Sequence, residues 1–325
     1  MSTLNDEQTQ KATGLLQAIH AELAKVIIGQ TAIIDEVLIG LVANAHILLE
    51  GVPGLGKTLL VKALARTFAG EFARIQFTPD LMPSDVIGHT IFDMTTNQFV
   101  TRRGPVFTNL LLADEINRAP AKTQSALLEA MQEYQVTLEG AANRLPQPFM
   151  VLATQNPIEQ EGTYPLPEAQ LDRFLLKIRI DYPDAREEAA LTRSVTDRNS
   201  GADLSVEAVK TLISPQHIEA LQKATALVDV EDRVLDYAVA IVRATRDHHG
   251  FAMGAGPRGS IGLIRAARGA ALLQGRAYIT PDDIRRVALP VLRHRVTLSP
   301  EAEIEGFTAD SSLAALLDSV AAPRA

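Results

Sequence analysis

The sequence has 325 residues, of which 46% are hydrophobic and 22% charged, with no cysteine and a formal net charge of −8. These values are typical of a globular protein with room for two domains, each with its own core, and they exclude disulfide frameworks, cysteine-ligated zinc and thiol catalysis. The negative balance argues against nucleic acid as a partner, because a field of that sign repels phosphate groups.

Neither the N-terminal residues nor the longest apolar runs of the sequence indicate a membrane segment. Residues 1–7 are polar and acidic and lack the apolar stretch of a signal peptide. The longest apolar runs, such as 266–273, are too short and too interrupted to cross a bilayer. We therefore expect a cytoplasmic protein with no membrane segment.

Apolar residues at helical spacing predict two helices near the start of the chain, within 4–26 and over 31–42. The turn between them contains Ile28 and Gly29. Apolar side chains beside free backbone groups suit a flat heterocycle, so this turn is a candidate wall of an adenine pocket. An ordinary turn between two helices is the alternative.

Residues 51–58 read Gly-Val-Pro-Gly-Leu-Gly-Lys-Thr and lie between an apolar run and a helix-forming segment. They fit the phosphate-loop pattern G-x-x-x-x-G-K-[ST], in which backbone N–H groups converge on phosphate oxygens at the start of a helix. We expect Lys57 to pair with the β- and γ-phosphates of ATP, and the Thr58 hydroxyl to ligate Mg²⁺. The other candidate nucleotide contacts are Gly51, Val52, Pro53, Gly54, Leu55, Gly56 and Leu59.

Two apolar runs, at 109–113 and 149–153, predict central strands buried on both faces. Asp114 and Glu115 follow the first run, and Asn156 follows the second, at the strand ends where open α/β sheets bind ligands. Asp114 would hold Mg²⁺, and Glu115 would orient and polarise the attacking water. Asn156 would hold that water or sense the γ-phosphate, with an ordinary Asn-Pro turn as the alternative.

Short alternating runs around polar turns predict a β-hairpin over 89–103 and a second hairpin within 135–146. Phosphate chemistry does not require the hairpin at 89–103, which we therefore interpret as an insertion. Arg173 precedes a last predicted strand at 175–180. Presented to the γ-phosphate of a neighbouring subunit, it would stabilise developing charge. A local salt bridge with Asp172 or Glu168 is the alternative.

Strands that alternate with helices predict an α/β domain over residues 1–183, with a five-stranded parallel sheet covered by helices on both faces. The pattern changes at residue 184, and an all-helical domain is expected over 184–325. Arg258 opens one of its helices, where it could reach the γ-phosphate bound by its own chain. An arginine on a helix surface is the alternative.

Together these residues resemble the motifs of AAA+ ATPases in their usual order. Residues 51–58 are similar to Walker A and 110–115 to Walker B, while Asn156, Arg173 and Arg258 match sensor 1, the arginine finger and sensor 2. The phrases Ala-Asp-Glu-Ile-Asn-Arg-Ala at 113–119 and Glu-Gly-Thr-Tyr-Pro-Leu-Pro-Glu-Ala at 161–169 resemble the MoxR subfamily.

The resemblance covers nearly the whole chain. The hairpin at 89–103 is similar to the helix-2 insert of the clade that includes magnesium-chelatase ATPase subunits. The family commonly has serine before the Pro-Arg of the lid, where this chain has Gly256.

The resemblance implies a Mg²⁺-dependent ATPase that remodels other proteins as a homohexameric ring. It also implies a separately encoded von Willebrand factor A partner and a role in maturation of, or metal insertion into, client complexes. Two other interpretations stay open, a DNA-associated motor and a nucleotide-gated scaffold with little turnover. The acidic balance argues against the first, and the intact pair Asp114 and Glu115 argues against the second.

Overall fold

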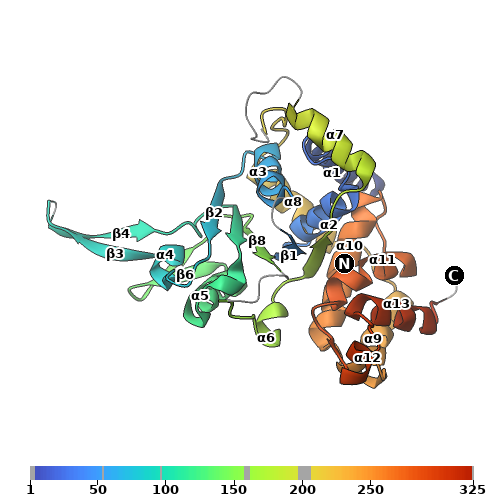
Figure 1. Ribbon diagram of the computed structural model, residues 1–325. Coiled ribbons are helices and arrows are strands. Elements are labelled where there is room, and N and C mark those ends of the chain that lie inside the picture. The colour runs from blue at the N-terminus through green and yellow to red at the C-terminus, as the bar shows by residue number, and fades with distance from the viewer. Residues whose placement is uncertain (1–3, 53–54, 96, 157–161, 197–205, 324–325) are drawn as a thin grey trace.

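The structure is a computed structural model that describes residues 4–52, 55–95, 97–156, 162–196 and 206–323 (Figure 1). Its centre is a five-stranded sheet with the strand order β2-β5-β8-β1-β9, in which all neighbours are parallel. The strands are β1 (Ile47–Gly51), β2 (Phe72–Gln76), β5 (Leu110–Asp114), β8 (Met150–Gln155) and β9 (Leu176–Ile180). The predicted five-stranded parallel sheet is therefore confirmed.

Alternation along the central strands divides the sheet into two apolar faces. In β5, Leu110 and Leu112 enter one hydrophobic cluster, while Leu111 and Ala113 enter another. Successive side chains of a strand point to opposite faces, so a wholly apolar run is buried on both sides. Helices therefore have to cover each face.

One face is covered by three helices from the first part of the chain together with helices from its last part (Figure 1). The early helices are α1 (Asp6–Leu23), α2 (Thr31–Val42) and α3 (Lys57–Thr67). The other face is covered by α4 (Pro83–Ile87) and α5 (Ala121–Glu133), with the 3₁₀ turn η1 (Ile116–Arg118) and the short α6 (Glu168–Leu171) near the sheet.

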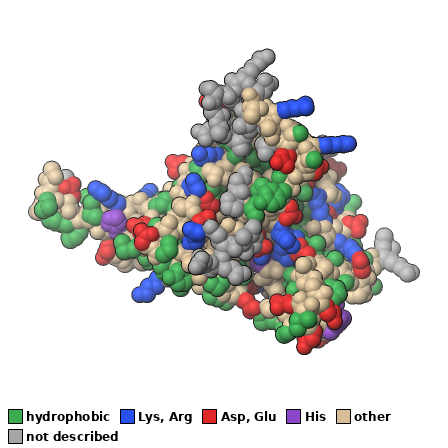
Figure 2. Space-filling model, in the orientation of Figure 1, with side chains coloured by type: hydrophobic (Ala, Val, Ile, Leu, Met, Phe, Trp, Pro, Cys, Tyr) green, Lys and Arg blue, Asp and Glu red, His purple; other side chains and the backbone are tan. Residues whose placement is uncertain are grey.

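Both expected hairpins are present. The first consists of β3 (Gly88–Asp93) and β4 (Gln98–Arg103), and it extends away from the body of the molecule (Figures 1 and 2). Its apolar side chains are strongly exposed, with Met94 at 87% and Phe99 at 77%. The second hairpin consists of β6 (Gln135–Leu138) and β7 (Ala141–Arg144).

The last part of the chain forms a helical lid. Its helices are α7 (Ala185–Thr196), α8 (Pro215–Ala226), α9 (Asp232–Asp247), α10 (Pro257–Leu273), α11 (Pro281–Leu292), α12 (Pro300–Ile304) and α13 (Ala309–Ser319). The lid also contains a small antiparallel sheet of β10 (Phe251–Met253) and β11 (Thr297–Leu298), so it is not purely helical as expected.

The lid and the early helices share one hydrophobic cluster. Thr13 in α1 donates a hydrogen bond to the carbonyl of Leu272 in α10, at 2.8 Å, and Arg286 in α11 pairs with Asp35 in α2 at 2.6 Å. The lid therefore shares a core with the early helices instead of having one of its own, and a second cluster lies on the other face of the sheet. Among the described helices, none combines the length and apolar character needed to cross a bilayer.

Candidate functional site

The phosphate-loop segment joins β1 to α3, and the structure shows why two of its positions are occupied by glycine. Gly56 precedes α3 with a φ of 76°, in the left-handed region that side chains with a Cβ rarely adopt. At Gly51, a Cβ would lie 2.5 Å from the carbonyl oxygen of Ile180. Pro53 and Gly54, which we also expect to contact nucleotide, lie outside the described residues.

Lys57 is the first residue of α3, and its ammonium group donates a hydrogen bond to the carbonyl of Gly51. Burial lowers the pKa of Lys57, while the carboxylates of Asp114, Glu115 and Glu50 oppose that effect. The ammonium group is thus partly desolvated and close to acids, an environment in which a phosphate would interact strongly with it.

The neighbouring residues of α3 differ in exposure. Thr58 is half-buried, as are Val52 and Leu55, whereas the side chain of Leu59 is packed in the core. Any nucleotide contact by Leu59 would therefore come from its backbone.

The two acids lie at the carboxyl end of β5. Asp114 accepts hydrogen bonds from Thr154 at 2.6 Å and from Arg74 at 2.6 Å. Glu115 has a φ of 55° and a side chain that accepts from Gln76 at 2.9 Å. Left-handed backbone at a residue other than glycine is often found at functional sites. The turn directs the two successive acids to different partners.

Three polar partners of these acids were not recognised from the sequence. Arg74 and Gln76 lie on β2, and Thr154 lies near the end of β8. For Thr154 the available signal was a hydroxyl residue directly after the apolar run at 149–153. Arg74 and Gln76 gave none, because only the strand order shows that β2 pairs with β5.

Asn156 follows β8, and β8 lies between β5 and β1 in the sheet. The strand ends therefore place Asn156 between the two acids and the phosphate-loop segment, at one edge of the sheet. No cluster of three or more His, Asp or Glu side chains that could hold a metal occurs within the described ranges. One hydroxyl, Thr58, and one carboxylate, Asp114, nevertheless fit Mg²⁺, which commonly takes one or two protein oxygens and completes its shell with water and phosphate oxygens.

The turn with Ile28 and Gly29 lies beside α7. Gly29 has a φ of 78°, and a Cβ there would collide with the side chain of Glu187 at 2.4 Å. The structure therefore places the Glu187 side chain of α7 against this turn. Its contact with adenine stays a prediction.

Arg173 lies at the opposite edge of the sheet from the phosphate-loop segment. It precedes β9, and the N–H of Leu175 donates to the carbonyl of His46 at 2.9 Å, just before β1 begins. The five residues of β1 then span roughly 16 Å to the loop. The Arg173 guanidinium donates to the carbonyl of Leu128 at 3.2 Å and to the side chain of Gln132, both in α5.

Arg258 lies beside Arg173 and not beside the phosphate loop. Its guanidinium is 3.5 Å from Asp172, and its side chain is 57% exposed. In this structure Arg258 therefore faces Asp172, and the expectation that it reaches the γ-phosphate bound by its own chain stays a prediction. The lid helix that carries it, α10, packs over the amino-terminal edge of the sheet, where α2 ends.

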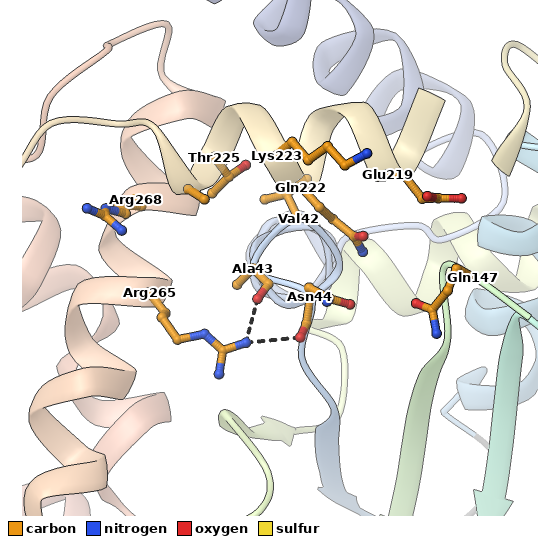
Figure 3. A pocket seen from close by; sticks show the side chains of 11 residues that line it. Val42, Ala43, Asn44, Gln147, Glu219, Gln222, Lys223, Thr225, Arg265 and Arg268 are labelled. Carbon is orange, nitrogen blue, oxygen red and sulfur yellow. Dashed lines mark hydrogen bonds between the residues drawn. The ribbon is translucent and has the colours of Figure 1, made fainter. Parts of the chain in front are cut away.

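The two arginines line a hollow of about 330 Å³ that also contains Arg265 and Arg295. An adjoining hollow of about 360 Å³ shares Asn44 and Arg265 with it and adds Lys223 and Arg268 (Figure 3). In Figure 3 the Arg265 guanidinium reaches from α10 to the carbonyls of Ala43 and Asn44, at 2.7 and 2.9 Å. This edge is therefore rich in cations, although the chain as a whole is acidic.

Comparisons with known proteins cover most of the chain. Residues 46–176 match the model of the ATPase family associated with various cellular activities (AAA), and residues 243–316 match an AAA lid domain. The protein YeaC of Bacillus subtilis is 46% identical over 309 residues, which are 95% of each chain. The chaperone MoxR1 of Mycobacterium tuberculosis is 44% identical over 328 residues, with 96% of this chain and 85% of the relative covered.

A crystal structure of a protein from Cytophaga hutchinsonii has the same fold. It superimposes with a TM-score of 0.90 and 42% sequence identity, and the match covers 98% of both chains.

Proposed function

This chain belongs to the MoxR group of the AAA family of ATPases, and on that premise we propose that it hydrolyses ATP at sites shared between neighbouring copies of a ring. The observation that carries the proposal is the separation of the functional side chains. Lys57, Asp114 and Glu115 belong to one edge of the sheet, and Arg173 and Arg258 to the other. Two copies in head-to-tail contact would unite the two sets, and such contacts form a ring when the rotation between neighbours closes.

Within one copy, the residues at the carboxyl edge would act on the phosphates of ATP. Lys57 would leave the Gly51 carbonyl and pair with the β- and γ-phosphates, and the backbone of 51–58 would surround them. Glu115 would orient and polarise the attacking water, and Asn156 would hold that water or sense the γ-phosphate. Thr58 and Asp114 would hold Mg²⁺, which neutralises charge on the phosphate oxygens.

From the next copy, the arginine edge would complete the site. Arg173 would turn from the α5 carbonyl to the γ-phosphate and stabilise the charge that develops during transfer. We propose that Arg258 acts beside it in trans, because both side chains border the same hollow. The surplus of positive charge on this edge complements a triphosphate.

We further propose that the ring has six copies and that it acts as a chaperone-like remodeller with a separate von Willebrand factor A protein. The support is the resemblance to the MoxR group and the relative named as a chaperone at 44% identity. Client complexes that need maturation or metal insertion are the proposed targets. Light scattering with ATP tests the ring, and a mass that does not correspond to six copies would contradict it.

The first prediction concerns Glu115→Gln. The variant should bind ATP with nearly unchanged affinity, since the phosphate-loop segment is intact, while turnover falls about 10²–10⁴-fold because the group that polarises water is lost. A phosphate-release assay and nucleotide titration measure the two quantities. Glu129→Gln, an exposed change on α5, is the matched control and should hydrolyse normally. Equal turnover by Glu115→Gln and wild type would disprove the assignment.

The same ATP-bound variant provides the test for the partner. A tagged Glu115→Gln ring, incubated with ATP and a cell extract, should retain a von Willebrand factor A protein that elutes when ATP is removed. Retention of that protein without nucleotide, or its absence from the eluate, would count against the proposed partnership.

A second prediction separates the two edges. Arg173→Ala alone and Glu115→Gln alone should each be nearly inactive. Mixed rings should recover turnover well above the sum of the two, because some interfaces then combine an intact Glu115 with an intact Arg173. Mixing each variant with itself is the control. The trans assignment fails if no mixing ratio restores activity.

A further inference from the structure

Arg295 is a buried lid arginine whose contacts concentrate on the segment that carries Arg173. It follows α11, and its side chain is only 4% exposed. The segment 172–175 connects α6 to β9 and includes Arg173. The guanidinium of Arg295 thus extends from the lid to the segment that carries Arg173, the proposed arginine finger.

The contacts use all three nitrogens of the guanidinium group. Nε donates to the Asp172 carboxylate at 2.8 Å, and Nη2 donates to the carbonyl of Phe174 at 2.7 Å. Nη1 donates to the carbonyl of Leu175 at 3.1 Å and also to that of Val291 in α11. Arg295 therefore fixes the backbone on the carboxyl side of Arg173 and the side chain on its amino side.

The Arg173 side chain is held from the opposite direction by α5, through Leu128 and Gln132. Its Nε is buried and lacks a hydrogen-bond partner. A guanidinium group held by one nitrogen is free to exchange that contact for another acceptor more easily than one held by a fork. The backbone is thus firmly anchored to the lid, while the side chain is weakly attached to the core.

We propose that Arg295 is a positioning residue that sets the location of Arg173 for the neighbouring copy, and that the lid thereby controls the trans half of the ATP site. The inference rests on the proposed trans function of Arg173. Asp172 links Arg295 to Arg258, the second proposed trans arginine. Its carboxylate accepts a hydrogen bond from Arg295 and lies 3.5 Å from the Arg258 guanidinium. A movement of the lid relative to the sheet would displace both arginines together.

The experiment uses Arg295→Lys. Lysine keeps a positive charge beside Asp172 but cannot form the fork to the Phe174 and Leu175 carbonyls. Turnover should fall about 10-fold to 100-fold, the range expected for a misplaced group, while affinity for ATP stays within about twofold of wild type. In mixed rings with Glu115→Gln, turnover should recover, because the lysine variant retains its own cis residues.

A double variant tests whether Arg295 acts through Arg173. Arg295→Lys should cause a much smaller fold-loss of turnover when Arg173 is already alanine than it causes alone, since residues acting in one unit are not additive. A fold-loss in the double variant as large as that of Arg295→Lys alone would overturn the proposal. So would normal turnover by Arg295→Lys, weakened ATP binding, or failure to recover in mixed rings.

Arg276→Lys is the matched control. Arg276 forms a two-pronged pair with the buried carboxylate of Asp283, at 2.6 and 2.7 Å, entirely within the lid. Its replacement should cost lid stability in a similar way but leave turnover within about twofold. If Arg276→Lys reproduces the loss and recovery seen for Arg295→Lys, the effect is one of general stability and the proposal is wrong.

Two further arms keep the outcome decisive. Should Arg295→Lys not fold, Asp172→Asn removes the carboxylate partner and should show the same recovery with Glu115→Gln. The mixture of Arg173→Ala with Glu115→Gln tests the proposed function separately. Recovery there without recovery for Arg295→Lys refutes the positioning role alone, whereas no recovery in either mixture refutes the trans site itself.

Discussion

A single hydroxyl organises both acids of the candidate site. Thr154 is 1% exposed, donates to Asp114 at 2.6 Å and accepts from the backbone N–H of Glu115 at 2.8 Å. One side chain therefore orients the carboxylate expected to hold Mg²⁺ and stabilises the left-handed turn at the residue expected to polarise water. Such a residue should matter for turnover more than for nucleotide affinity.

We predict that Thr154→Val lowers turnover about tenfold and destabilises the fold by about 1–3 kcal/mol, because a buried N–H and a carboxylate oxygen lose their partner. Valine matches threonine in shape, so packing is preserved. Thr154→Ser restores the hydroxyl and should behave like wild type. Steady-state phosphate release and thermal unfolding measure the two effects, and full activity of the valine variant would contradict the role of the hydroxyl.

At the scale of elements, most of the fold could be predicted, and the differences have local causes. The helix 31–42 agrees with α2 residue for residue. Helix α11 continues to Leu292, although Pro290 lies inside it and proline normally ends a helix. Burial of Pro290, Val291 and Leu292 against the core outweighs the lost N–H. The β10–β11 pair escaped prediction because strands of two or three residues leave no periodic pattern.

The candidate site could be predicted only where its residues are neighbours in sequence or end adjacent strands. Asp114 ends β5, the other four residues come after strands, and parallel strands bring their carboxyl ends to one edge; the four are Lys57, Thr58, Glu115 and Asn156. The location of Arg258 depends instead on how the lid packs. That packing arises from apolar surfaces shared by α2 and α10. The sequence indicates that each helix has an apolar face, but it does not show that these two faces pack against each other. The roles of all these residues stay predictions until turnover is measured.

For the molecule as a whole, the contact between the early helices and the lid contains a carboxyl group that opposes folding when it ionises. Glu36 in α2 is half-buried, and burial raises its pKa to about 7. Arg293 and Arg286 counteract that effect, whereas Asp35 and Asp310 reinforce it. Because the folded-state pKa exceeds the ordinary value of 4.5, this group lowers stability as pH rises from about 4.5 through 7.

We predict that Glu36→Gln stabilises the protein at pH 8 by about 2 kcal/mol and has a much smaller effect at pH 5. At pH 8 the wild-type carboxyl is ionised in a partly buried position, whereas at pH 5 it is protonated in the folded protein. Denaturant unfolding at the two pH values measures the difference. Glu303→Gln, an exposed change in α12, should show no such pH dependence. Equal effects of Glu36→Gln at both pH values would contradict the prediction.

The shared hydrophobic core also has a consequence for how the chain is made. The hydrogen bond from Thr13 to Leu272 joins residues 259 positions apart, and the pair of Asp35 with Arg286 joins residues 251 positions apart. A ribosome that has synthesised α1 and α2 must still add most of the chain before α10 and α11 can cover them. During that interval their apolar sides are open to wrong contacts. A protein proposed to remodel others would therefore itself be prone to misfolding while it is being synthesised.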